Sequence, residues 1–145
     1  MYSHILIATD GTELGERGLD QGLKLAKALG ANVTVLTVVE PITGLAMEAL
    51  VQGEAFDTYE TRLNDALAEI ENAVQAKASE VGLPVEFLRE TDGAPAAAII
   101  RTAETKGCDL IVMSTHGREG IERLVSGSQT ARVVAHSTLP VLVVH

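Results

Sequence analysis

Five short apolar runs alternate along the chain with longer segments of helical periodicity, and this alternation constrains the fold more than any other feature. The apolar residues of each run are largely consecutive, as in strands that are covered on both faces within a parallel sheet. Strands that alternate with helices predict an α/β fold in which helices pack on both faces of a mostly parallel sheet. The runs are His4–Thr9, Asn32–Val39, Val85–Arg89, Asp109–Ser114 and Leu139–Val144.

Four helices are expected between these strands, and most of them carry a recognisable start or stop. Gly30 and Gly82 follow the first two helical patterns, and Pro95 suits the first turn of the third. The segment Ile42–Asp57, whose apolar residues are interrupted by glycine, is expected to be a long connection. The expected helices run over about Glu13–Leu29, Thr58–Val81, Pro95–Gly107 and Ser128–His136.

The order of these elements leaves few topologies. Because crossovers are right-handed, we expect a single doubly wound open sheet over residues 1–145, with strand order 3-2-1-4-5. Ligands bind such sheets beyond the carboxyl ends of the strands, where the strand order reverses, which here is between the first and fourth strands. The turn Asp10–Thr12 and the stretch Ile111–Thr130 are therefore expected to meet at one site.

The composition excludes several classes of partner. A formal net charge of -9 argues against nucleic acid, which favours a basic surface, and against attraction to anionic lipid. No stretch approaches the ~20 apolar residues of a membrane span, and the N-terminus lacks the pattern of a signal peptide. The single cysteine, Cys108, excludes an internal disulfide and is expected to be a core residue. A cytoplasmic protein of one domain, without membrane insertion, is the simplest interpretation.

The stretch Ile111–Thr130 is the strongest candidate for binding chemistry. It begins as a buried strand, passes through a loop that contains Gly117, and reaches Gly127-Ser128, where a helix is expected to start. Glycine lets a phosphate approach the backbone, and free N–H groups at a helix start point at the anion. No Lys follows the last glycine, so this is not a Walker loop, and an ordinary turn is the alternative. Groups able to meet phosphate charge are the backbone N–H groups, Ser128, Arg118 and Arg123.

Two further residues near the expected site have both a structural and a functional interpretation. Asp10 directly follows the first strand and can cap a helix or close an Asx-turn before Gly11. The same carboxylate can instead serve a nucleotide, by accepting a hydrogen bond or by holding Mg²⁺. No Ser or Cys nucleophile with a partner base is evident around His116, which is expected to form hydrogen bonds within its loop.

Several segments together resemble the universal stress protein family over the whole chain. They are residues 5–12, 35–41 and 108–120, the Gly127-Ser128 pair, and the terminal run 140–144. The ATP-binding branch of that family carries a glycine, two residues, a second glycine, nine residues, and then Gly-Ser or Gly-Thr. In this chain Ser114 replaces the first glycine, and Gly117 and Gly127-Ser128 match the others. The small serine adds a hydroxyl that is itself a candidate to bind ribose or phosphate.

The resemblance implies, position by position, which residues surround a nucleotide. Asp10 and its neighbours Ala8 and Thr9 would line the adenosine side, and the backbone of Val38 would contact adenine. The ribose and phosphates would be bordered by Met113, Ser114 and Gly117. The phosphates would be held by Gly127, Ser128, Gln129 and Thr130.

The resemblance therefore implies an ATP-binding regulatory protein of the stress response, whose nucleotide state alters its conformation or its choice of an unidentified protein partner. The family is usually dimeric, and an exposed apolar edge at Leu139–Val144 predicts antiparallel pairing with a second copy. Two alternatives stay open. One is a nucleotide-free homodimeric interaction module, and the other is an adenylylating enzyme, for which the sequence offers no base beyond His116. At most a weak ATPase activity is expected.

Overall fold

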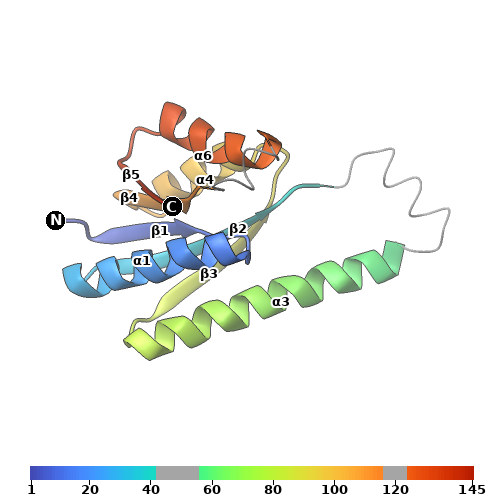
Figure 1. The fold of residues 1–145 in the computed structure, drawn as a ribbon, viewed down its shortest axis with the longest axis horizontal. Coiled ribbons are helices and arrows are strands. Elements are labelled where there is room, and N and C mark those ends of the chain that lie inside the picture. The colour runs from blue at the N-terminus through green and yellow to red at the C-terminus, as the bar shows by residue number, and fades with distance from the viewer. Residues whose placement is uncertain (42–55, 116–123) are drawn as a thin grey trace.

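The computed structural model describes residues 1–41, 56–115 and 124–145 of the chain, and its centre is a parallel five-stranded sheet (Figure 1). The strands are β1 His4–Ala8, β2 Asn32–Val39, β3 Val85–Thr91, β4 Leu110–Ser114 and β5 Val141–Val144. They lie in the order β3-β2-β1-β4-β5, which confirms the predicted topology. The register places Ile7 of β1 between Val35 of β2 and Val112 of β4.

Helices cover both faces of this sheet, as the alternation of the sequence predicts. They are α1 Glu13–Leu29, α3 Phe56–Val81, α4 Pro95–Thr105 and α6 Leu124–His136. Helices α1 and α3 pack on one face, and α4 and α6 pack on the other (Figure 1). Within the described part of the chain, no helix is long and apolar enough to cross a membrane.

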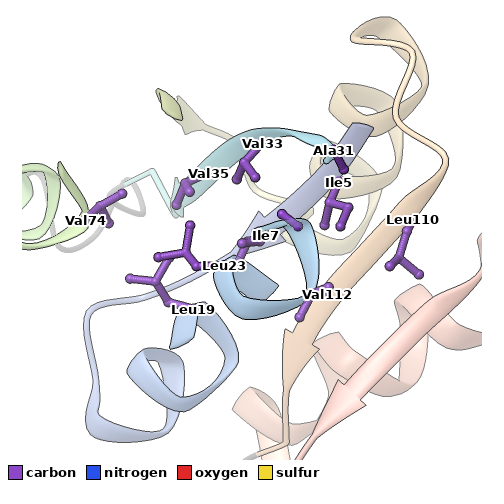
Figure 2. Close-up of a cluster of buried hydrophobic side chains, with 11 residues drawn as sticks. Ile5, Ile7, Leu19, Leu23, Ala31, Val33, Val35, Val74, Leu110 and Val112 are labelled. Atoms are coloured by element: carbon purple, nitrogen blue, oxygen red, sulfur yellow. The ribbon is translucent and has the colours of Figure 1, made fainter. Parts of the chain in front are cut away.

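The sheet divides the core into two layers because successive residues of a strand point to opposite faces. On β1, Ile5 and Ile7 pack with Leu19 and Leu23 of α1, in the cluster that Figure 2 shows. Leu6, which lies between the two isoleucines, packs in the opposite layer with residues of α4 and α6. These side chains are at most 2% exposed, and burying each contributes about 1.5–3 kcal/mol. Both faces of β1 are covered, which explains its consecutive apolar residues.

Several boundaries differ from the sequence prediction by a few residues. Strand β3 extends to Thr91 because the next N–H, that of Asp92, still donates to the Val39 carbonyl of β2 at 2.9 Å. Strand β5 starts at Val141 rather than Leu139, because the Leu139 N–H donates to the Ser137 hydroxyl at 3.0 Å instead. Helix α3 begins at Phe56, so residues 42–55 of the expected connection lie outside the described part of the chain.

The start of α6 is the prediction that was wrong. The helix begins at Leu124, four residues before the expected start at Ser128, so Gly127 and Ser128 lie within it. A Gly-Ser pair resembles a helix start, but a glycine inside a helix costs only about 1 kcal/mol relative to alanine. Packing of the fully buried Val133 on the sheet outweighs that cost. The free N–H groups of α6 therefore lie upstream of Gly127.

Hydrogen bonds to the carboxylate of Asp109, the residue before β4, hold the amino ends of the central strands together. Its carboxylate accepts from the N–H of Ser3 at 2.9 Å, the hydroxyl of Ser3 at 3.0 Å and the N–H of His4 at 3.0 Å. These bonds, with that from the Ser3 N–H foremost, hold the pKa of Asp109 below its usual value. The N–H of Asn32 also donates to the Ser3 carbonyl at 2.9 Å. The amino edge of the sheet is closed by contacts within the chain.

Candidate functional site

A cavity of about 410 Å³ opens at the carboxyl edge of the sheet, over the ends of β1 and β4, where the strand order reverses. Eight residues that the sequence placed around a ligand line this cavity: Ala8, Thr9, Asp10, Val38, Met113, Ser114, Gln129 and Thr130. Two more, Gly127 and Ser128, belong to α6. Outside the described residues lie His116, Gly117, Arg118, Gly120 and Arg123.

One wall of the cavity is apolar and is held in place by hydrogen bonds between neighbouring strands. The Thr9 N–H donates to the Leu36 carbonyl at 3.0 Å, and the Thr37 hydroxyl donates to the Thr9 carbonyl at 2.9 Å. Both threonines are buried, so these bonds fix the end of β1 against β2. The wall consists of Leu36 and Val38 of β2, Met113 of β4, and Pro95 and Ile99 of α4.

Asp10 lies at the mouth of the cavity and has a structural role in the turn that follows β1. Its Oδ1 accepts from the N–H of Thr12 at 3.0 Å and from the Thr12 hydroxyl at 2.6 Å. The Thr12 hydroxyl in turn accepts from the Gly15 N–H at 3.1 Å and so caps α1. Among the described residues, the other carboxylate oxygen of Asp10 receives no hydrogen bond. The Asx-turn interpretation and a ligand role are therefore compatible, because they use different oxygens.

The hydroxyl groups of Ser114 and Thr130 are engaged within the protein. Ser114 Oγ donates to the backbone carbonyl of Leu14 in α1 at 2.6 Å. The Thr130 hydroxyl, on α6, donates to the Ser114 carbonyl at 3.0 Å. The structure thus directs the Ser114 hydroxyl to α1, whereas the sequence suggested that it binds ribose or phosphate. Ser114 connects the end of β4 to helices on both faces of the sheet.

Gln129 joins α6 to the start of α4 at the cavity wall. Its Oε1 accepts from the backbone N–H of Ala96 at 3.1 Å, which satisfies one of the free N–H groups in the first turn of α4. Because this bond requires the amide oxygen, it fixes which way the side-chain amide is oriented. The amide nitrogen of Gln129, which can only donate, is left for the cavity that the residue lines.

The comparisons with known proteins give the family. The model of the universal stress protein family matches residues 1–145. The chain belongs to the universal stress protein family. It is 33% identical to universal stress protein MJ0531 of Methanocaldococcus jannaschii over 99% of this chain and 82% of that protein. It is 32% identical to universal stress protein YxiE of Bacillus subtilis over 99% of both chains.

Solved structures of the family share the fold. The structure of MJ0577 of Methanocaldococcus jannaschii superposes with a TM-score of 0.74 at 29% identity, covering 99% of this chain and 96% of that one. A universal stress protein in complex with cAMP also superposes with a TM-score of 0.74, at 25% identity, covering 99% of this chain and 97% of that one. The α/β fold with strand order 3-2-1-4-5 is thus that of the family.

Six residues that line the cavity of this universal stress protein were missed by the sequence analysis: Leu14, Gly15, Leu36, Glu40, Pro95 and Ile99. Four of them, Leu14, Gly15, Pro95 and Ile99, lie on α1 and α4, and neither turn residues nor the family motif indicate which helix faces turn toward a cavity. Ile99 carried a signal, since an apolar residue one turn after the helix-starting Pro95 must face the sheet near its carboxyl edge. Glu40 carried a similar signal because it directly follows β2.

Asp10 and Glu40 place two carboxylates at the cavity, and no basic side chain lines it within the described ranges. This part of the cavity therefore suits hydrogen-bond donors and apolar surface better than anionic groups. Within the same ranges, no group of three or more His, Cys, Asp or Glu side chains is arranged to hold a metal ion.

Proposed function

We propose that this universal stress protein binds an adenine nucleotide in the cavity at its switch point, and that the bound state alters its conformation or its choice of protein partner. The observation that carries this proposal is the convergence of eight expected ligand residues, from five separate elements or turns, on one cavity. Its volume of about 410 Å³ lies in the range typical of small-molecule sites. A related protein of the same fold, 25% identical, is found in complex with cAMP.

The chemistry of the cavity suits a particular orientation of the nucleotide. Adenine would lie against the apolar wall near Val38, while the free oxygen of Asp10 and the carboxylate of Glu40 would accept hydrogen bonds from ribose hydroxyls. The Gln129 amide nitrogen would donate to a ring nitrogen or to an oxygen of the ligand. Phosphates would point away from Glu40, toward the start of α6, where free N–H groups favour an anion.

ATP with Mg²⁺ is the specific form that we propose. Mg²⁺ is usually bound by one or two carboxylates together with phosphate oxygens and waters, so a single carboxylate beside a triphosphate is a sufficient protein contribution. Asp10 is the candidate, because one of its oxygens is already fixed by Thr12 and orients the other. A cytoplasmic location and an unidentified regulatory partner belong to the same proposal.

Binding is tested by isothermal titration of AMP, ATP with Mg²⁺, cAMP and GMP, beside native mass spectrometry of the purified protein. Val38→Trp should fill the cavity and abolish binding of AMP, ATP and cAMP, because the indole occupies the space proposed for adenine, and GMP tests whether the parent selects adenine. Val134→Trp is the matched control, since Val134 is 53% exposed on α6 and does not line the cavity. A parent protein that binds none of the three adenine nucleotides, or a Val38→Trp variant that binds them normally, would contradict the proposal.

We further propose that the protein is a homodimer through β5. This strand ends the sheet, pairs on one side with β4, and exposes 39% of Leu142. An exposed apolar edge strand favours pairing with a second copy, and a two-fold axis makes that pairing antiparallel.

The dimer is tested by Leu142→Lys, which should yield a monomer in analytical ultracentrifugation. Leu29→Lys is a matched control, because Leu29 is 37% exposed but lies in the last turn of α1, where a cation is favourable. If the parent sediments as a monomer, or if Leu142→Lys remains a dimer of unchanged stability, the β5 interface is wrong.

A further inference from the structure

Ser114 occupies the point where α1, β4 and α6 meet at the wall of the cavity. Its Oγ donates to the Leu14 carbonyl in the first turn of α1 at 2.6 Å. Its own carbonyl accepts from the Thr130 hydroxyl of α6 at 3.0 Å, and Thr130 is only 7% exposed. Leu14, Ser114 and Thr130 all line the cavity, so these two bonds set the relative positions of three of its walls.

Gly18 of α1 leaves the room that the Ser114 hydroxyl requires. A Cβ at position 18 would collide with Ser114 Oγ. The same Cβ would lie 3.5 Å from the Ser114 nitrogen and 3.6 Å from its Cβ, and both distances are ordinary contacts. The conflict therefore concerns a single atom, the hydroxyl oxygen. Gly18 is 96 residues before Ser114 in sequence (114 − 18), so no local pattern links the two.

We propose that Ser114 is a positioning residue of the nucleotide site and that Gly18 is the partner that allows it to act. This inference rests on the proposed nucleotide binding. Serine replaces the first glycine of the nucleotide-binding motif, and a hydroxyl at that point would crowd a ligand if it turned toward the cavity. Because Gly18 has no side chain, the hydroxyl turns toward α1 instead, bonds to Leu14, and leaves the cavity to the ligand. The substitution for glycine is thus compensated within the chain.

The test is a double-mutant cycle built on Gly18→Ala and Ser114→Ala. In Gly18→Ala, the added methyl group displaces the Ser114 hydroxyl from its bond to the Leu14 carbonyl, and the hydroxyl rotates toward the cavity. This variant should weaken AMP binding by about 10-fold or more. Ser114→Ala removes the bond to Leu14 but leaves the cavity open, and should weaken binding by only about 3-fold. In the double variant the alanine methyl at 18 fills the space left by Oγ, so the affinity should return to within about 3-fold of the parent.

Gly22→Ala provides the matched control on the same face of α1. It brings the same gain in helix propensity as Gly18→Ala, and its Cβ would lie 2.5 Å from Cδ1 of Ile7 rather than near Ser114. Its melting temperature should fall, and Ser114→Ala should not rescue it. A rescue of Gly22→Ala equal to that of Gly18→Ala would show that Ser114→Ala relaxes α1 in general, and would overturn the specific pairing.

Melting temperatures and AMP titrations are recorded for all variants, because the two readouts separate two failures. If the parent binds no AMP, the proposed function and the positioning role both fail, while rescue of the melting temperature still reports the steric pairing. If the parent binds AMP, the inference is overturned when Gly18→Ala binds as tightly as the parent, or when the double variant binds no better than Gly18→Ala. Affinity that recovers only in the double variant supports it, since a purely structural role would change the melting temperature alone.

Discussion

The two edges of the sheet use the same kind of residue in different ways. At the amino edge, both oxygens of Asp109 accept hydrogen bonds from Ser3 and His4, and the strand ends are joined directly. At the carboxyl edge, Oδ1 of Asp10 accepts hydrogen bonds from Thr12, and Asp10 lines a cavity together with residues of α4 and α6. Both oxygens of Asp109 are thus used within the chain, whereas one oxygen of Asp10 can still accept a hydrogen bond from a ligand.

This difference shows how a fold can assign stability and binding to opposite ends of one set of strands. Hydrogen bonds that are complete within the chain stabilise the protein but offer nothing to a ligand. At the carboxyl edge, Asp10 and Gln129 each use only part of their hydrogen-bonding capacity: Asp10 accepts from Thr12 through Oδ1, and Gln129 accepts from Ala96 through its amide oxygen. The used half fixes the position of the group, and the other half is presented to the cavity. Such preorganisation lowers the entropic cost of binding.

The largest effect that separates the two edges is expected from Asp10→Ala. If the free oxygen of Asp10 accepts a ligand hydrogen bond, AMP binding should weaken by about 1–3 kcal/mol, the scale of a hydrogen bond to a charged group. Titration calorimetry at a temperature well below unfolding measures this loss. The effect on the melting temperature should be small by comparison with the effect on AMP binding, since Thr12 still caps α1.

Asp10→Asn is the control for this variant, because it keeps an oxygen that can accept from Thr12. It should restore the melting temperature and recover only part of the affinity. If the parent and Asp10→Ala bind AMP with equal affinity, the role of Asp10 is limited to the Asx-turn. Asp10 and Asp109 would then both be structural residues.

Gln129→Glu sharpens the comparison within the carboxyl edge. A carboxylate can still accept from the Ala96 N–H, and a negative charge is favourable in the first turn of α4. It cannot donate to the ligand, however, and it adds repulsion toward phosphate. We expect AMP affinity to fall by about 1–2 kcal/mol while the melting temperature is unchanged or higher. A variant that lost affinity and stability together would show that the Ala96 bond, rather than the donor, had been disturbed.

Much of this arrangement could be predicted from the sequence, and the reason lies in burial. Strands covered on both faces must be consecutively apolar, so the runs around Ile7 and Val112 indicated a parallel sheet, and the strand order then placed the site. The start of α6 could not be predicted, because Gly127 and Ser128 have the composition of a cap whether or not they form one. Nor could the bond from Ser114 to Leu14, which only the folded chain brings together.

The amino edge should respond to acid rather than to nucleotide. The N–H groups of Ser3 and His4 hold the pKa of Asp109 below its usual value of 3.8. A carboxylate with a depressed pKa stabilises the folded state above the unfolded pKa, and that stabilisation is lost as the pH falls through the folded pKa. Asp109→Asn should therefore lower the melting temperature by about 2–4 °C at pH 7, and the difference should shrink below pH ~4.

AMP affinity of Asp109→Asn should equal that of the parent at pH 7, since the change lies at the opposite edge from the cavity. Melting curves between pH 3 and pH 8, with one titration at pH 7, provide the measurement. A difference in melting temperature that stayed constant into acid would mean that the packing of Asp109, rather than its charge, supports the amino edge.

The smallest expected effect concerns Cys108, which lies beside Asp109 and is 5% exposed. Burial raises the pKa of its thiol to about 11, so very little thiolate is present at pH 8. In the native protein the thiol should react with a disulfide reagent far more slowly than after denaturation, and AMP should not change that rate. A cysteine introduced by Glu40→Cys at the cavity should react readily and be protected by AMP. Because Cys108 reacts slowly, the rates of both thiols can be measured separately in the Glu40→Cys variant. If AMP slowed the reaction of both thiols, nucleotide would act on the whole fold rather than on one edge of the sheet.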